Sequence, residues 1–388
     1  MMNLSVSKYV CVSAAMAVLA VAPAAWAADC SNLPDMDHPH ETITNGKVTA
    51  VIMLPDPTNG FYRGVRFDWA GSVACATVNG HKFWGEWFAP APYNATRSDG
   101  VMGPAEEFRV ADSSLDHTGP NGTLFVKPGA NGYNEAKPGD AFLKPGVGML
   151  KRIDEKDYSY GTNYPILDGG TWTNSHTSTS VSSKQVLKGS NGYAYEYEKV
   201  MSLDKNGTTL SITHHLKNTG TKPIQTFIYN HDFFQFDDEP TNSGIVVRFP
   251  WKPDASDLQG ALAKANGNEI DFTDPPPPSP PPAAPVAPAG SAAPGGAPGR
   301  RGGGGGGGGR GSMGYLTGFS NKVSDFDITV ENTKTGVGVE ETSDTPLARL
   351  YFWSQAKVVC PEGYIAVDIA PGKTQSWTLH YRLITPAK

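Results

Sequence analysis

The feature that most constrains the fold is an alternating stretch in the middle of the chain. Tyrosine recurs at every second position from Tyr193 to Tyr197, which is the period of a strand that buries one face. Asn206-Gly207 marks a tight hairpin turn, and residues 218–223 are rich in turn formers. We therefore predict an antiparallel meander of three strands across residues 193–237.

The rest of the chain also favours strands over helices. Glycine (44 residues) and proline (32) are abundant, while charged residues make up only 18%, a composition typical of a loop-rich β-protein. Only residues 257–265 have a fair helical pattern. The predicted fold class is all-β, a large antiparallel sandwich with few short helices. Further strands are predicted at residues 47–54, 63–69, 347–353, 363–369 and 375–384.

One stretch cannot belong to the folded core. Residues 275–311 are almost entirely proline, alanine, glycine and arginine, so they bury too little apolar surface to offset their ordering entropy. The residues that follow read as a few strands without a core of their own. We therefore predict one domain, residues 28–388, interrupted by a disordered insertion at 275–311, since long surface loops cost little stability.

The N-terminus predicts export. Lys8 precedes an apolar run at residues 9–21, and Ala25-Trp26-Ala27 matches a cleavage pattern. We predict a signal peptide at residues 1–27 and a periplasmic or secreted protein, without stable membrane insertion after cleavage. The formal net charge of −6 and the absence of a long basic run argue against a nucleic-acid partner.

The cysteines predict a disulfide but do not identify it. Cys11 would leave with the signal, and Cys30, Cys75 and Cys360 would remain. In an oxidising compartment the simplest outcome is one disulfide and one free thiol. Their spacing shows no metal pattern, and we predict neither a metal nor another cofactor.

The end of the meander carries the first candidate for chemistry. On a strand, Phe227, Tyr229, His231 and Phe233 share one face. Flat aromatic rings cover the C–H faces of a sugar, and an imidazole handles a hydroxyl or ring-oxygen proton. The alternative is a histidine buried in the sheet core.

Three segments resemble the galactose mutarotase, or aldose 1-epimerase, superfamily. Residues 229–234 (Tyr-Asn-His-Asp-Phe-Phe) resemble its Asn-His strand, residues 358–362 (Val-Val-Cys-Pro-Glu) resemble a Val-Cys-x-Glu segment, and residues 371–383 resemble the closing strand. The resemblance implies a β-supersandwich with a sugar on its concave face. The implied reaction is the interconversion of sugar anomers.

The resemblance also implies two catalytic roles. Glu362 would remove the proton of the anomeric hydroxyl, and His231 would protonate the ring oxygen. Pro361 precedes Glu362 and predicts a break in strand pairing that directs the carboxylate into a cleft. The alternative for Glu362 is an exposed loop carboxylate.

The chain departs from the family pattern in its first half. A second histidine motif is missing, and the nearest segment has Glu106 and Glu107 instead. The family's Gly-Arg-x-Ala-Asn-Arg motif is also missing, so Arg63 and Arg66 are our candidates for substrate binding. Together with Arg109 they would suit a uronate carboxylate.

Two further groups of residues are candidates for sugar contact. Phe83 and Trp87 would share one face of a strand, as a stacking platform or as core. Glu106 and Glu107 offer the carboxylates of glycosidic acid/base chemistry, although neighbours on a strand face opposite ways.

These patterns favour a carbohydrate-binding protein with sugar or polysaccharide as its partner. The first hypothesis is an aldose 1-epimerase-like isomerase using Glu362 and His231. The second is a secreted polysaccharide lyase or glycosidase on the same fold. The third is a sugar-binding protein without turnover.

Overall fold

The computed structural model describes five ranges and two single residues. They are residues 30, 33, 37–87, 94–96, 101–109, 131–274, 311–386 and nothing else of the chain. The predicted signal peptide and residues 275–310 of the predicted insertion lie outside the described residues. Within these ranges the regular structure is β-strand, apart from a short 3-10 helix, η4 (Val323–Asp325). No helix in the described part has the length and hydropathy to cross a membrane.

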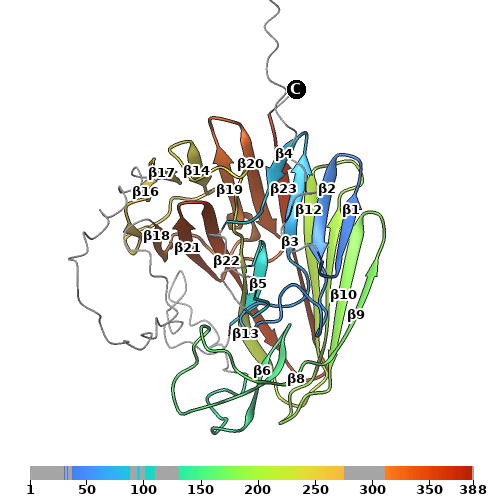
Figure 1. Cartoon of the computed structure of the whole chain (residues 1–388). Helices are drawn as coiled ribbons and strands as arrows, with labels where there is room; N and C mark the ends of the chain where they lie inside the picture. Colours follow the sequence, from blue (N-terminus) through green and yellow to red (C-terminus); the bar gives the residue numbers. More distant parts are fainter. Residues whose placement is uncertain are drawn as a thin grey trace, which may run out of the picture.

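The largest element is an antiparallel sheet of ten strands, which runs from β16 at the left of Figure 1 to β9 at the right. The alternating stretch at residues 193–203 lies near one end of this sheet. In spatial order its strands are β16 (Ala263–Asn266), β17 (Glu269–Phe272), β14 (Ile245–Arg248), β19 (Asp327–Asn332), β20 (Val337–Ser343), β23 (Thr374–Ile384), β12 (Thr209–Asn218), β11 (Tyr195–Leu203), β10 (Ser180–Leu187) and β9 (Thr171–His176).

A second antiparallel sheet of six strands packs on the first. The ring of Phe108 in β5 lies edge-on to Tyr197 of β11 and Trp377 of β23, so the core lies between the two sheets. This arrangement confirms the predicted all-β sandwich. The strands, in spatial order, are β15 (Gln259–Gly260), β18 (Ser312–Tyr315), β21 (Arg349–Gln355), β22 (Val358–Ile369), β13 (Ile224–His231) and β5 (Ala105–Phe108).

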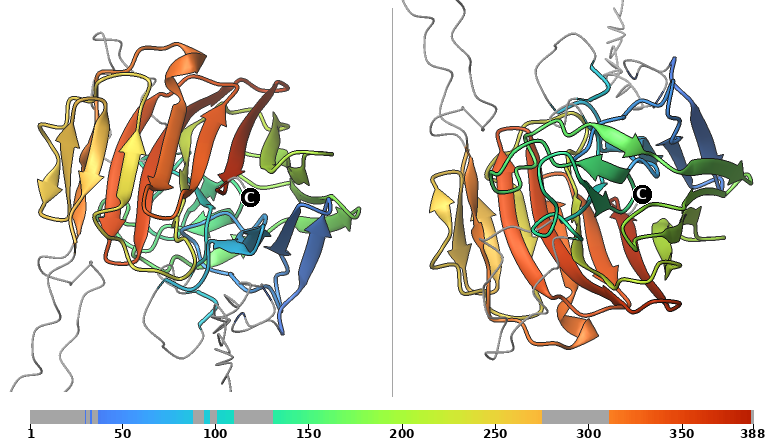
Figure 2. Two further views of the ribbon diagram at one scale, coloured as in Figure 1. Left: turned by 90° about the horizontal axis from the view of Figure 1, so that it is seen from above. Right: turned by 90° about the horizontal axis from the view of Figure 1, so that it is seen from below.

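Two small sheets complete the described structure. The first contains β1 (His40–Thr44), β2 (Val48–Met53), β3 (Val73–Val78) and β4 (His81–Phe83); the second contains β6 (Ala141–Lys144), β7 (Gly148–Lys151) and β8 (Ile166–Asp168). β1 lies beside the edge of the ten-stranded sheet formed by β9 and β10 (Figure 2), where the Thr44 N–H donates to the carbonyl of Ser178 in the turn between β9 and β10 (2.7 Å).

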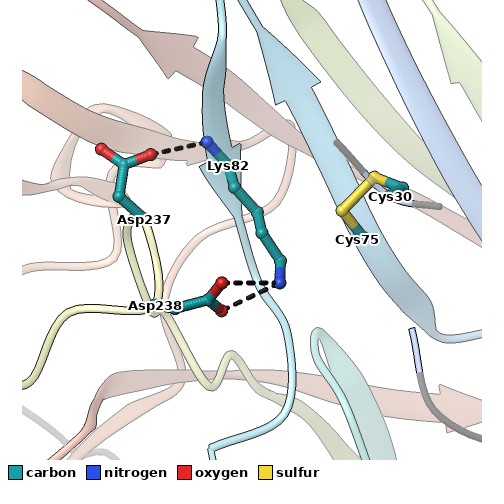
Figure 3. Close-up of a disulfide and its surroundings, with 5 residues drawn as sticks. All are labelled: Cys30, Cys75, Lys82, Asp237 and Asp238. Carbon is teal, nitrogen blue, oxygen red and sulfur yellow. Dashed lines mark hydrogen bonds and ion pairs between the residues drawn. A yellow bond between two sulfur atoms is a disulfide. The ribbon is translucent and has the colours of Figure 1, made fainter. Parts of the chain in front are cut away.

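The structure decides the cysteine pairing that the sequence leaves open. Cys30 and Cys75 form a disulfide (Figure 3), and Cys360 is a buried free thiol. The bond ties the segment before β1 to β3.

The predicted three-strand meander is correct for two strands and wrong for the third. β11 and β12 pair as a hairpin, but β13 crosses to the six-stranded sheet and pairs there with β22 and β5. The turn explains the crossing, because the Asn218 side-chain amide donates to the carbonyls of Lys222 and Ile369 (2.8 Å each). Ile369 ends β22, so this turn is tied to the second sheet.

Two other predicted elements are also wrong. Residues 63–69 form no strand, because the Tyr62 hydroxyl accepts the N–H groups of Arg66 and Phe67 (3.2 Å each) and bends the chain. Residues 257–265 form no helix but contribute β15 and part of β16, with Gly260 at a φ of 98°. Sheet pairing here outweighs a weak local helical preference.

The core between the sheets holds an unusual polar cluster. The Tyr381 hydroxyl lies 3.2 Å from a carboxyl oxygen of Asp232 and 3.2 Å from one of Glu341, and it accepts a hydrogen bond from the Asn230 amide. A hydroxyl has one hydrogen, so it cannot donate to both carboxyls. One carboxyl must carry its own proton, in line with burial, which raises the pKa of Glu341 to about 8 and raises that of Asp232.

This cluster predicts a loss of stability as pH rises. The unfolded chain releases its carboxyl protons near their ordinary pKa values, whereas the folded protein keeps the Glu341 proton until pH is about 8. Between about pH 5 and pH 8 the folded state therefore binds more protons, and the free energy of unfolding falls with increasing pH. Urea unfolding across this range measures the slope.

A matched pair of variants tests its source. Glu341→Gln supplies its own N–H donor, so we expect a shallower slope, whereas Glu340→Gln on the same strand should keep the wild-type slope. Glu340 pairs with Arg382 at the surface (2.6 Å). An equal slope in wild type and Glu341→Gln would contradict the assignment.

Candidate active site

His231 ends β13 on the face turned away from the sandwich core. β13 pairs with β22 up to Tyr229 and Tyr364, and an isolated bridge between Phe234 and Val359 continues the same register beyond a gap. Directly opposite residues in an antiparallel pair share a face. The register therefore brings His231 against Glu362, with Nε2 and Oε1 3.3 Å apart.

The structure decides between the two predictions for Glu362. The residue lies inside β22, paired with Tyr351 of β21, and is not an exposed loop carboxylate. Pro361 has no N–H, and the ladder between β22 and β13 is interrupted at this point. The predicted strand 224–237 is likewise shorter, because β13 ends at His231 and Phe233 has a φ of 47°.

Aromatic rings enclose the imidazole. Phe233 stacks on His231 with ring centroids 3.8 Å apart, and Trp353 approaches its edge at 4.9 Å. Trp87 stacks on the far side of Phe233 (4.8 Å). The side chains of His231 and Glu362 keep only 6% and 5% exposure, so both groups are largely removed from water.

This burial fixes the charge state of the pair. Desolvation raises the pKa of Glu362 to about 8, although Arg66 and Arg109 act against that shift. Desolvation, together with the Arg66 charge, lowers the pKa of His231 well below its ordinary value. At neutral pH the pair therefore holds one exchangeable proton, which lies on the Glu362 carboxyl and faces Nε2 of a neutral imidazole.

A second polar group lies beside the pair. Glu107 of β5 stands opposite Tyr229 of β13 and accepts hydrogen bonds from the Tyr229 hydroxyl (2.7 Å), Arg66 Nε (3.0 Å) and Lys144 Nζ (3.2 Å). Arg109 lies 3.6 Å from the same carboxylate. These cations outweigh burial and lower the pKa of Glu107, so Glu107 is a fixed anion rather than a proton carrier.

Glu107 also orients Arg66 toward the site. A second guanidinium nitrogen of Arg66 donates to the Tyr229 hydroxyl (3.1 Å). The guanidinium lies between the rings of Phe67 (4.6 Å) and Tyr160 (4.5 Å), and Tyr160 is 48% exposed. Arg66 therefore extends from the buried Glu107 carboxylate to an exposed aromatic ring.

Three of the predicted site residues lie elsewhere or play another part. Glu106 faces the opposite side of β5, between the sheets, where it binds Lys199 and His214 (2.8 Å each). Arg63 donates to the Gly60 carbonyl (2.9 Å), and no described contact joins it to His231. Trp87 reaches the site through Phe233, and its own N–H donates to the Val101 carbonyl (3.0 Å).

Sequence reasoning missed Trp353, Lys144 and Tyr351. Alternation within residues 347–353 places Tyr351 and Trp353 on one face, but that pattern does not reveal β22 as the neighbour of β21. Lys144 had no signal of its own, because it reaches Glu107 from a separate small sheet.

The segment after His231 is clamped to β4. The backbone N–H of Lys82 donates to the Asp237 carboxylate (2.8 Å), and its ammonium group binds both carboxylate oxygens of Asp238 (2.9 and 3.0 Å), as Figure 3 shows. His81 also lies 2.9 Å from Asp237. This clamp ties Asp237 and Asp238, which follow β13 in the chain, to β4.

Comparisons with known proteins give similarity to solved structures only. No family model matches the chain, and no curated protein matches it. The chain is similar to solved galactose mutarotase-like structures. A putative aldose 1-epimerase from Escherichia coli K12 is 10% identical, with a TM-score of 0.45 over 90% of this chain and 99% of that one. A galactose mutarotase-like protein from Clostridium acetobutylicum is 12% identical, with a TM-score of 0.47 over 90% and 96%.

Another similar structure is the Slr1438 protein of Synechocystis sp. PCC 6803, which is 11% identical with a TM-score of 0.48 over 90% of this chain and 96% of that chain.

The described residues contain no group of three or more histidine, cysteine, aspartate or glutamate side chains placed to hold a metal ion.

Proposed function

We propose that the protein is a carbohydrate-active enzyme that interconverts the anomers of a sugar, with Glu362 and His231 as its acid/base pair. The observation that carries the proposal is the contact between these two groups, 3.3 Å apart in an aromatic setting and almost fully buried. Ring opening of a cyclic sugar needs a base and an acid at the same moment. A pair with one proton supplies both.

The single exchangeable proton of the pair fits this reaction. The carboxylate takes the anomeric hydroxyl proton while the imidazolium donates a proton to the ring oxygen, which breaks the bond between that oxygen and C1. Rotation about C1–C2 and closure reverse the two transfers. The form with a neutral imidazole and a protonated carboxyl differs from the active form only in where the one proton lies.

Other side chains on the same face support sugar binding. The register places Tyr351 beside Glu362, and Trp353 contacts His231. Rings of this kind pack on the C–H groups of a pyranose. Arg66 and the Tyr229 hydroxyl, both held by Glu107, would supply hydrogen bonds to substrate oxygens.

Optical rotation tests the proposal. Purified protein should accelerate the rotation decay of at least one freshly dissolved α-anomer in a panel of hexoses, pentoses, uronic acids and sugar phosphates. New ultraviolet absorbance with a uronate polysaccharide would select a lyase instead, and released reducing ends would select a glycosidase. Binding to glycans without any product would select a sugar-binding protein.

The pKa of Glu362 predicts the pH dependence. Above its value of about 8 the pair loses its single proton and has no acid, so kcat/KM should fall about tenfold per pH unit there. The depressed pKa of His231 delays the gain of a second proton, and the profile should stay flat from pH 7.5 down to about 6. A rate that rises through pH 9 would contradict this assignment.

We also propose that the enzyme works outside the cytoplasm. The disulfide between Cys30 and Cys75 belongs to an oxidising compartment, which supports the export predicted from residues 1–27. Detection of the mature protein in a periplasmic or culture-medium fraction tests this.

A further inference from the structure

A sulfur atom lies on the other side of the His231 ring from Glu362. Cys360 Sγ is 3.2 Å from Nδ1, while Nε2 faces the Glu362 carboxyl at 3.3 Å. Sγ also accepts the backbone N–H of Phe233 (3.1 Å). Each ring nitrogen therefore has one partner. A thiol, an imidazole and a carboxyl in this order also describe a nucleophile, its base and an orienting group.

The surroundings of Cys360 exclude nucleophilic attack. The residue has 0% exposure, whereas a reactive thiol is partly exposed in an electropositive setting. Burial, with the Glu362 and Asp232 charges, raises the pKa of the thiol well above its ordinary value. Cys360 is therefore a neutral S–H group at neutral pH. It can affect the chemistry only through the imidazole that it contacts.

We propose that Cys360 is a positioning residue that holds His231 in the tautomer with its hydrogen on Nδ1, which leaves Nε2 to exchange the proton with Glu362 and the sugar. The hydrogen count supports this tautomer. The protonated Glu362 carboxyl donates to Nε2, so the one hydrogen of the neutral ring is on Nδ1 and points at the sulfur. The catalytic meaning rests on the proposed function, but the tautomer is a property of the free protein.

Nitrogen NMR of the full mature protein, labelled with ¹⁵N-histidine, reads the tautomer directly at pH 7. The His231 signals are identified by their loss in His231→Gln. We expect a protonated Nδ1 and an unprotonated Nε2 in wild type. Cys360→Ser keeps an acceptor and should keep this tautomer, whereas Cys360→Ala removes it and should shift the ring toward Nε2–H.

A control variant separates positioning from packing. Val359 is buried (1% exposed) in the same strand and points to the opposite face, so Val359→Ala should leave the His231 signals unchanged. Anomer interconversion gives the catalytic readout: Cys360→Ala should lower kcat about tenfold with little change in KM, as for other outer partners of a catalytic group, and Cys360→Ser should restore most of it.

Three results would overturn the proposal: a wild-type His231 with its hydrogen on Nε2, a Cys360→Ala spectrum equal to wild type, or rapid alkylation of Cys360 by iodoacetamide in the native protein. The last result would mark an accessible thiol and a nucleophilic role. If wild type shows no anomer interconversion, the proposed function fails, while the nitrogen spectra still decide the role of Cys360.

Discussion

Replacing Glu362 with glutamine should lower the rate of anomer interconversion about a thousandfold, within the range for loss of a general acid/base group. Glutamine keeps the shape and the hydrogen-bond donor but cannot exchange a proton. Because the buried carboxyl has its pKa raised to about 8, the neutral amide replaces a group that is itself neutral at pH 7. We therefore expect little loss of stability, so the kinetic effect is separable from unfolding.

Glu340→Gln is the matched control for this variant. It makes the same chemical change in β20 of the ten-stranded sheet, at a carboxylate bound to Arg382, and should leave kcat/KM unchanged. Full activity in Glu362→Gln would remove Glu362 from the mechanism. An unfolded variant would contradict the neutral-carboxyl assignment.

Among the variants named here, Glu107→Gln should lower the free energy of unfolding most, by about 3–5 kcal/mol, as expected for breaking a buried ion pair. The carboxylate has 0% side-chain exposure and binds Arg66 at 3.0 Å and Lys144 at 3.2 Å. Glutamine leaves the buried Lys144 ammonium without its carboxylate. Urea unfolding at pH 7 measures the change in the free energy of unfolding.

A second variant identifies the cause. Adding Lys144→Met to Glu107→Gln removes the uncompensated charge and should recover part of the lost stability, whereas Lys144→Met alone should destabilise the protein. Equal stability of Glu107→Gln and wild type would show that the carboxylate does not hold these cations together. By comparison, Glu340→Gln should cost less than about 1 kcal/mol, because its ion pair is partly exposed.

Alternation along single strands was enough to predict the all-β class. The period of two from Tyr193 to Tyr197 identifies β11, and Asn206-Gly207 identifies the hairpin to β12. Alternation does not reveal which strand pairs with one whose two faces are both buried. β13 is such a strand, and for that reason its move to the second sheet was not predictable.

The candidate site was likewise predictable only in part. His231 and Glu362 were found from residue type and resemblance, yet their contact depends on the register between β13 and β22, which no local pattern reports. Glu106 and Glu107 were correctly expected on opposite faces, but only the sheet packing shows that Glu107 is the one beside the pair. Lys144 was missed because its role arises from a contact between separate sheets.

Exchange NMR on an equilibrated sugar that responds in the optical-rotation panel tests the acid/base role of His231 and Glu362 most directly. Cross-peaks between the α and β anomeric protons report interconversion alone, with no product to separate. We expect cross-peaks that grow with the concentration of wild-type protein and are absent with an equal concentration of Glu362→Gln. Equal cross-peaks with both proteins would contradict a catalytic pair of His231 and Glu362.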